Sequence, residues 1–368
     1  MALKSQVQQL RQEVIELGGG RTVRLGPVLG KGTTATVYRG ELVTCNGVRR
    51  KVAVKVFCAV SSDESEQVFA SLVKTSQRTA CVDHPNVVEV HECLDWRGQP
   101  TLITELVDGI SLADLQYQFT SSNRRMPLDV ALFVAGEVAE ALAGARAARG
   151  PDGFQLRMVH HSINTREVLL SWRGEVKIGD FEMANARAAS SSIRSLRQLA
   201  ARAAAMAPEV ARGIEADARS DVFAFGVLLY ELLIGPRFPA NIGNSDAMKL
   251  AREGYVQPQT FKPNLPHGAL AIIERCLEVD PELRYPNAVA LAYDLRRVIL
   301  ALGVGDGRYF LRRTLEHEFA ERAEEGTSEL QLPMGPGVKP AQSDEIEVYD
   351  GEVVEIEPRR SASSSRRR

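Results

Sequence analysis

Residues 29–40 read LGKGTTATVYRG, and this glycine-rich stretch lies between two segments that are rich in β-branched residues. The flanking segments, 22–28 and 36–43, predict two strands joined by a hairpin. Glycines at a hairpin tip let backbone N–H groups approach phosphate oxygens closely. Because glycine-rich hairpins are common, this stretch indicates a function only together with the strand that comes next in the chain.

That strand, predicted over 48–58, contains Val52-Ala53-Val54-Lys55. Side chains alternate between the two faces of a strand, so Lys55 lies on the face opposite Val52 and Val54. Lys55 therefore faces either solvent or a cleft. The strand pattern alone leaves both possibilities open.

Beyond this strand the periodicity predicts one helix, two more strands and then a mostly helical half. This order predicts an α+β fold of two lobes, the first β-rich with one helix and the second mainly helical. The predicted elements are a helix over 65–80, strands over 87–94 and 101–106, and helices over 128–148, 219–234, 244–253, 268–278 and 287–302.

Composition sets limits on the class of protein. The 368 residues are 44% hydrophobic and 25% charged, as in globular proteins, and the net charge of −2 argues against a dedicated nucleic-acid binder. The five cysteines form no C-x-x-C pair, so neither a zinc site nor a disulfide framework is expected. Without a signal-peptide pattern or a long apolar run, we expect a cytoplasmic protein.

Both ends of the chain differ from its centre. Near the N-terminus, apolar residues at spacings of three and four predict a helix that stops at Gly18-Gly19-Gly20, packed on its own domain or dimerising as a coiled coil. The expected divisions are a helical leader over 1–20, lobes over 21–105 and 106–303, a helical extension over 304–329, and a charged, disordered tail over 330–368.

Further motifs come in a fixed order, and together with the glycine-rich loop and the lysine strand they resemble the protein kinase superfamily. The resemblance covers about residues 22–302 and is nearest to bacterial-type Ser/Thr kinases. The motifs are His84-Pro85-Asn86, Thr104 to Gly109, Asp180-Phe181, Ala207-Pro208-Glu209, Arg219-Ser220-Asp221 and Asp280-Pro281-x-x-Arg284.

The resemblance implies a bilobal kinase fold and a site for ATP and Mg²⁺. It also implies that Glu209 and Arg284 form a buried, structural ion pair. The implied nucleotide contacts are Leu29, Gly30 and Gly32 in the loop, Val37, Ala53 and Leu169 around adenine, Thr104 as gatekeeper, the backbone of Glu105 and Leu106 at the base, Lys55 at the phosphates and Asp180 at Mg²⁺.

The catalytic loop departs from the family pattern H-R-D-L-x-x-x-N, because residues 160–167 read HHSINTRE. After His160 and His161, Ser162 takes the place of the aspartate that orients the substrate hydroxyl. Serine cannot accept that proton at neutral pH, and general-base help is typically worth 10²–10⁴-fold. Asn164 replaces a lysine, and Glu167 replaces the metal-binding asparagine but can still ligate Mg²⁺ through oxygen.

Other departures agree with this loss. Glu182 replaces the glycine of D-F-G, and Thr75 takes the place of the helix glutamate that pairs with the strand lysine. Lys55 is therefore expected to lack its usual partner, unless the helix is shifted and brings Glu64 or Glu66 close. Residues 201–206 lack the family's Gly-Thr-x-x-Tyr.

The arginine- and alanine-rich segment before Ala207 is open to two interpretations. Its composition favours a helix that begins near Ser192, runs through Ala203 and covers the family's peptide groove. A solvated loop with good helix propensity is the alternative.

These features predict a pseudokinase that binds ATP and Mg²⁺ and acts by docking a protein partner, such as an active kinase. One alternative is a divergent active kinase that transfers the ATP γ-phosphate to protein Ser/Thr, with Glu167, His161 or a repositioned acid as base. Another is a structural scaffold with a closed pocket. We expect no membrane or nucleic-acid partner for the folded part, and the sequence leaves the oligomeric state open.

Overall fold

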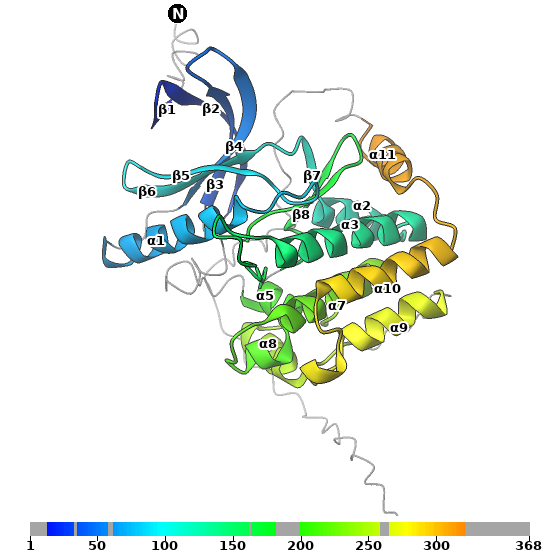
Figure 1. The fold of residues 1–368 in the computed structure, drawn as a ribbon. Coiled ribbons are helices and arrows are strands. Elements are labelled where there is room, and N and C mark those ends of the chain that lie inside the picture. Colours follow the sequence, from blue (N-terminus) through cyan, green and yellow to red (C-terminus); the bar gives the residue numbers. More distant parts are fainter. Residues whose placement is uncertain are drawn as a thin grey trace, which may run out of the picture. The chain divides into compact units, whose positions relative to one another are not determined.

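The computed structural model describes residues 13–32, 35–57, 62–161, 163–181, 199–257 and 265–320. Its first part is a six-stranded antiparallel sheet with the order β1-β2-β3-β4-β6-β5, and helix α1 (Ser62–Thr79) packs against it (Figure 1). The strands are β1 (Val14–Gly18), β2 (Arg21–Lys31), β3 (Ala35–Val43), β4 (Arg49–Phe57), β5 (Val90–Trp96) and β6 (Gln99–Glu105).

Two apolar clusters stabilise this sheet. Val52, Val54 and Ile103 are fully buried in one of them, as the alternation along β4 predicts. In the other, α1 contributes Val68 and Leu72. Ala53 and Lys55 belong to neither cluster. They lie on the face of β4 opposite Val52 and Val54, which they share with Phe57 of the second cluster.

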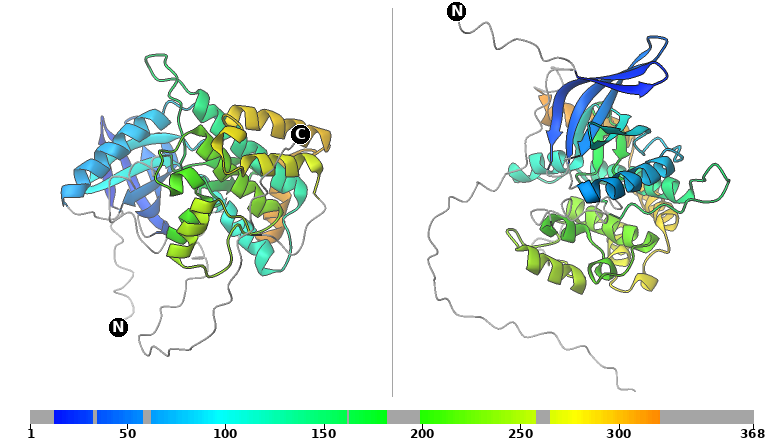
Figure 2. Two further views of the ribbon diagram at one scale, coloured as in Figure 1. Left: turned by 90° about the horizontal axis from the view of Figure 1, so that it is seen from below. Right: turned by 90° about the vertical axis from the view of Figure 1, so that its left-hand side faces the viewer.

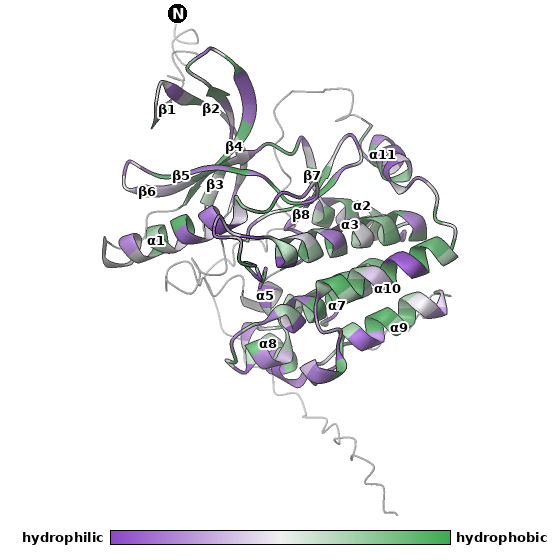
Figure 3. Ribbon diagram, viewed as in Figure 1, coloured by the Kyte–Doolittle hydropathy of each residue, from purple (hydrophilic) through white to green (hydrophobic). Residues whose placement is uncertain are grey.

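The second part of the fold is mainly helical, and α7 (Ala218–Leu233) is buried along almost its whole length. It packs on α3 (Leu128–Ala147) and α9 (His267–Cys276), whereas α11 (Gly307–Glu318) is polar outside one apolar stripe, as Figure 3 shows. None of the helices in the described ranges is long and apolar enough to cross a membrane. The other elements are β7 (Gly109–Ser111), α2 (Leu112–Ser121), β8 (Val168–Ser171), β9 (Val176–Ile178), α5 (Leu199–Ala205), α6 (Pro208–Ala211), α8 (Asn244–Glu253), a 3₁₀ turn (Pro281–Leu283) and α10 (Ala288–Ala301).

The predicted α+β arrangement of a β-rich half followed by a helical half is confirmed (Figure 2). The two halves are joined where the segment after His84-Pro85 meets β9. The N–H of Val88 donates to the carbonyl of Ile178, and the N–H of Ile178 donates to the carbonyl of Asn86. The Asn86 side chain also donates to the carbonyl of Val176. This motif therefore fixes the sheet on the helical half.

The predicted N-terminal helix is wrong where the structure describes it, because Val14–Gly18 form strand β1. The three glycines at 18–20 all have positive φ and make a tight hairpin turn, so that Ile15 pairs with Val23 and is buried beside it. A buried Ile15 beside an exposed Val14 is a strand pattern that the wider spacing of three and four obscured. Residues 1–12 lie outside the described ranges.

The helix predicted within 304–329 is present as α11. Leu311 and Leu315 are fully buried in the core of the helical half, and Arg124 makes a two-pronged ion pair with Glu318. The tail predicted over 330–368 lies outside the part of the chain that the structure describes.

Candidate functional site

The strand lysine faces the second half of the fold. Lys55 Nζ lies 2.6 Å from Asp180 Oδ2, with both side chains largely shielded from solvent. Asp180 has a φ of 65° and lies just beyond the end of β9. This contact decides between the two orientations that the sequence left open, because Lys55 points into the space between the halves rather than to solvent.

The residues predicted to surround the adenine base lie on strands near the pair of Lys55 and Asp180. In the sheet register, Ala53 pairs with Thr104 of β6, and Val37 pairs with Lys55. Leu169 lies on β8, which pairs with β9 just before Asp180. The structure thus brings these residues to strands that border one face, while Leu29, Gly30 and Gly32 belong to the β2–β3 hairpin above them.

The segment that joins the two halves is held by an ion pair. Glu105 Oε1 lies 2.6 Å from Lys177 Nζ and also accepts a hydrogen bond from the N–H of Glu89. Leu106 comes directly after Glu105 and is half-buried. These contacts fix the backbone of Glu105 and Leu106, which is the group predicted to meet the base.

The catalytic-loop region is anchored from below by a buried carboxylate. The N–H groups of His160 and His161 donate to Asp221 Oδ2 and Oδ1, at 2.7 and 2.8 Å. Burial raises the pKa of Asp221 to about 7, although the two backbone hydrogen bonds act in the opposite direction. Asp221 lies in the first turn of α7, so the loop's register is set by the central helix.

His160 is buried and packs on Phe181. Its Nε2 lies 2.8 Å from the carbonyl of Gly179, and the two ring centroids are 4.5 Å apart. Burial lowers the pKa of His160 to about 4, so the ring is neutral at physiological pH. A neutral ring held in this way is a structural support and not a proton acceptor for substrate.

The described neighbours of the exchanged loop residues are held by hydrogen bonds and burial. Ser162 itself lies outside the described residues, as does Glu182, but the neighbours of Ser162 are fixed: His161 is held by Asp221 and Ile163 is fully buried. Glu167 donates its N–H to the carbonyl of Asn164 and accepts from the N–H of Gly179 through its own carbonyl.

Helix α1 presents no acid to Lys55 at the predicted place. Thr75 is buried, and its hydroxyl donates to the carbonyl of Ser71 one turn earlier. Glu66 is exposed, and the side chain of Glu64 is outside the described set. Among the described residues, Lys55 has Asp180 as an acidic partner.

The segment before Ala207 is helical where the structure describes it. Residues 199–205 form α5, which packs on α8 through the fully buried Ala203, while residues 182–198, with the predicted helix start at Ser192, lie outside the described ranges. The helix ends against Arg237, whose Nη1 donates to the carbonyls of Ala204 and Met206 at 2.7 and 2.9 Å.

Arg237 was not identified from the sequence. It is fully buried, its Nε donates to the carbonyl of Tyr255, and its guanidinium stacks between the rings of Phe223 and Phe238. Burial lowers its pKa to about 10, so it stays charged at neutral pH. The one sequence feature that could have indicated a buried Arg237 is its position shortly after the apolar helix α7 and next to Phe238.

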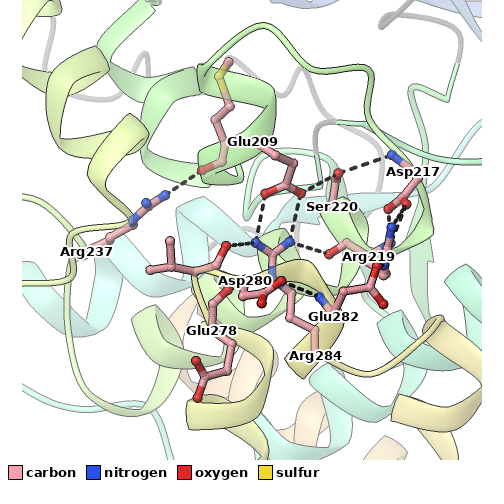
Figure 4. A network of polar contacts seen from close by, with 11 residues as sticks. Glu209, Asp217, Arg219, Ser220, Arg237, Glu278, Asp280, Glu282 and Arg284 are labelled. Carbon is pink, nitrogen blue, oxygen red and sulfur yellow. Dashed lines mark hydrogen bonds and ion pairs between the residues drawn. The ribbon is translucent and has the colours of Figure 1, made fainter. Parts of the chain in front are cut away.

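The ion pair predicted for the second half is present (Figure 4). Arg284 Nη1 and Nη2 donate to Glu209 Oε1 and Oε2, both at 2.8 Å, and Ser220 Oγ donates to Oε1. Burial alone raises the pKa of Glu209, but the hydrogen bonds from Arg284 and Ser220 outweigh it and hold the pKa below its usual value. Paired charges of this kind fix the Ala207-Pro208-Glu209 element on α7.

Comparison with known proteins agrees with this geometry. The model of the family described as protein tyrosine and serine/threonine kinase matches residues 23–293. A probable serine/threonine-protein kinase of Streptomyces coelicolor is 32% identical over 296 residues, which cover 78% of this chain and 41% of that protein.

Two further relatives have similar levels of identity. Tyrosine-protein kinase MasK of Myxococcus xanthus is 28% identical over 307 residues, covering 83% of this chain and 47% of that protein. Serine/threonine-protein kinase PknB of Mycobacterium leprae is 29% identical over 280 residues, covering 74% and 42%. The chain spans less than half the length of these curated relatives. The family match and the anchored catalytic-loop region together show that the chain belongs to the protein kinase family, with bacterial serine/threonine kinases among its relatives.

Proposed function

We propose that this chain is a pseudokinase, a kinase-fold module that binds ATP and Mg²⁺ and acts by docking a partner protein rather than by phosphorylating it. The observation that carries the proposal is the anchoring of His160 and His161 on Asp221. It supports the motif alignment, in which Ser162 takes the place of the family's base aspartate. Without that carboxylate no group at this position orients or deprotonates a substrate hydroxyl.

The segment before Ala207 supports the same conclusion. Members of the family present an extended platform to a peptide there, whereas this chain forms helix α5 and ties its end to the buried Arg237. Releasing α5 would leave these carbonyls and a buried guanidinium without their partners, which is costly. The helix is therefore a stable feature that works against peptide-substrate binding.

The nucleotide half of the site supports retained binding. Lys55 and Asp180 have the charges that a triphosphate and a divalent cation require, and they lie together already. Asp180 and Glu167 offer oxygen donors, which Mg²⁺ prefers. Bound Mg²⁺ would neutralise phosphate charge, and Lys55 would then exchange the Asp180 carboxylate for phosphate oxygens.

Two measurements on the same preparation test the proposal. ATP with Mg²⁺ should raise the melting temperature, because a ligand that binds only the folded state stabilises it. The rise should be lost in Lys55→Met and in Asp180→Asn. In parallel, radiolabelled ATP should give no incorporation into the chain or into a general protein substrate.

Phosphate incorporation that disappears in Lys55→Met would establish the rival, a divergent active kinase using Glu167 or another acid. Absence of any nucleotide effect, with no incorporation, would instead favour the closed structural scaffold.

A further inference from the structure

An open cavity of about 830 Å³ lies at the far side of the helical half, away from the nucleotide site. The C-terminal end of α3, the segment before the catalytic loop, the end of α9 and the first turns of α10 enclose it. Its charged lining consists of three arginines, Arg146, Arg157 and Arg275, and one acid, Asp294. The lining therefore carries a net charge of about +2 at neutral pH, which favours an anionic ligand.

Two of these arginines have no ion-pair partner within the described residues. Neither Arg146 nor Arg157 forms an ion pair with any residue in the described ranges, and Arg146 Nη1 makes only a long hydrogen bond of 3.4 Å to the carbonyl of Arg157. Arg275 lies 4.0 Å from Asp294 and stacks on Tyr285 at 4.1 Å. Stacking on a buried ring holds the Arg275 guanidinium in place for a ligand.

The backbone at this cavity is held in an uncommon conformation. Arg157 has a φ of 49°, a conformation that residues with a side chain rarely adopt. Two other lining residues are held in place: Tyr285 comes directly after Arg284 of the buried ion pair, and Asn287 caps α10 by accepting from the N–H groups of Val289 and Ala290. The cavity is thus built before any ligand arrives.

An apolar surface continues from the cavity. Tyr293 and Val289, which line it, are 66% and 49% exposed, and Leu300 extends the same face of α10 with 72% exposed. Phe154, beside the lining residue Gln155, is 75% exposed. Exposed aromatic and aliphatic side chains beside an arginine cluster suit a peptide, which brings side chains of its own.

We propose that this arginine cavity binds a phosphorylated serine- or threonine-containing segment of a partner protein. A phosphoryl group has a charge of −1.5 to −2 at neutral pH and three acceptor oxygens, which matches the net charge of the lining and the geometry of the guanidinium groups. Residues on either side of the phosphoryl group would pack on Tyr293 and Val289. This proposal names the partner class for the docking role proposed above and rests on that role.

Immobilised peptide libraries with a fixed central phosphoserine, and the same libraries with serine, test the proposal on the full chain. We expect the immobilised phosphoserine library to retain the protein and the serine library not to retain it. The affinity of Arg157→Gln/Arg275→Gln for the phosphoserine library should be at least tenfold lower than that of the wild type. Tyr293→Glu, which places a negative charge in the cavity at an exposed position, should have the same effect. Arg24→Gln/Arg50→Gln, which removes the same charge from the sheet, should bind within twofold of the wild type.

Equal retention of both pools, or unchanged binding by the two cavity variants, would overturn the proposal. Binding of the protein to an immobilised single-stranded RNA homopolymer as tightly as to the phosphoserine library would also overturn it, because such binding would indicate unspecific charge attraction. The ATP-dependent rise in melting temperature, measured on the same variants, should be unchanged. If the chain does not bind ATP, the rise in melting temperature will be absent while phosphopeptide binding is unaffected, so the two proposals can fail separately.

Discussion

At the scale of single residues, His160 connects burial with pH. Its ring is fully buried beside Phe181, and its pKa is lowered to about 4 from an ordinary value of 6.5. The unfolded chain therefore binds a proton between pH 6.5 and 4 that the folded chain does not. Stability contributed by the neutral ring is complete above pH 6.5 and is lost as the pH falls toward 4.

We predict that between pH 7 and pH 5 the wild type loses about 2 kcal/mol of unfolding free energy relative to His160→Gln. The comparison is necessary because burial raises the pKa of Asp221 and of Glu231 to about 7, and these acids change stability in the opposite direction. Both acids titrate in the two proteins, so urea unfolding at each pH isolates His160. Parallel pH profiles would contradict the prediction.

The residues proposed for the nucleotide site could be named from the sequence because each belongs to a motif with fixed spacing. The contact of Lys55 with Asp180, which are 125 residues apart in the chain, was not expected from these motifs. Two buried groups were less visible. Asp221 was part of a motif, but its hydrogen bonds with the N–H groups of His160 and His161 join residues about 60 positions apart, and the sequence does not show such contacts. Arg237 belongs to no motif, and its burial beside Glu231 runs against the usual exposure of arginine.

At the scale of elements, α5 depends on Arg237 for its C-terminal end. The last carbonyls of a helix have no partner within the helix, and here Arg237 supplies donors to Ala204 and Met206. Short alanine-rich helices are marginal alone, so this cap decides whether α5 persists.

We predict that Arg237→Met accelerates amide hydrogen exchange across 199–206 by at least tenfold. Methionine keeps the contact with Phe223 and Phe238 but donates no hydrogen bond. The matched control is Arg252→Met, since exposed Arg252 donates from its Nε to a single carbonyl, that of Ala211. Equal exchange in wild type and Arg237→Met, measured by mass spectrometry, would show that α5 is stable without its cap.

Elements with a long, regular pattern were predicted within a few residues, as α3 and α10 illustrate, because their apolar faces repeat over several turns. Strand β1 was not. Its five residues are too few to show a period, and its stability comes from pairing with β2 through a turn of three glycines with positive φ. Such pairing is a tertiary contact that a short local pattern does not contain.

At the scale of the whole molecule, the question is whether the two halves unfold together. They are tied by the backbone pairing of Val88 with Ile178 and by the ion pair of Lys55 with Asp180. Helix α11 lies on the helical half, where Leu311 is fully buried, so a defect there reaches the sheet through contacts such as these and the ion pair of Lys177 with Glu105.

Each half contains one of the chain's two tryptophans. Trp96 lies in β5, and Trp172 contacts Phe319, the residue that follows α11.

We predict that Leu311→Ala lowers the unfolding free energy by about 2–5 kcal/mol, the usual cost of such a cavity. Fluorescence of the single-tryptophan proteins Trp96→Phe and Trp172→Phe should report the same shifted urea midpoint, because a cooperative unit loses both halves at once. Phe310→Ala, at an exposed neighbouring position of α11, should leave both midpoints close to their original values. A shift seen by Trp172 alone would mean that the sheet holds its structure after the helical half has opened, and that the ties through β9 and Lys55 are too weak to couple the halves.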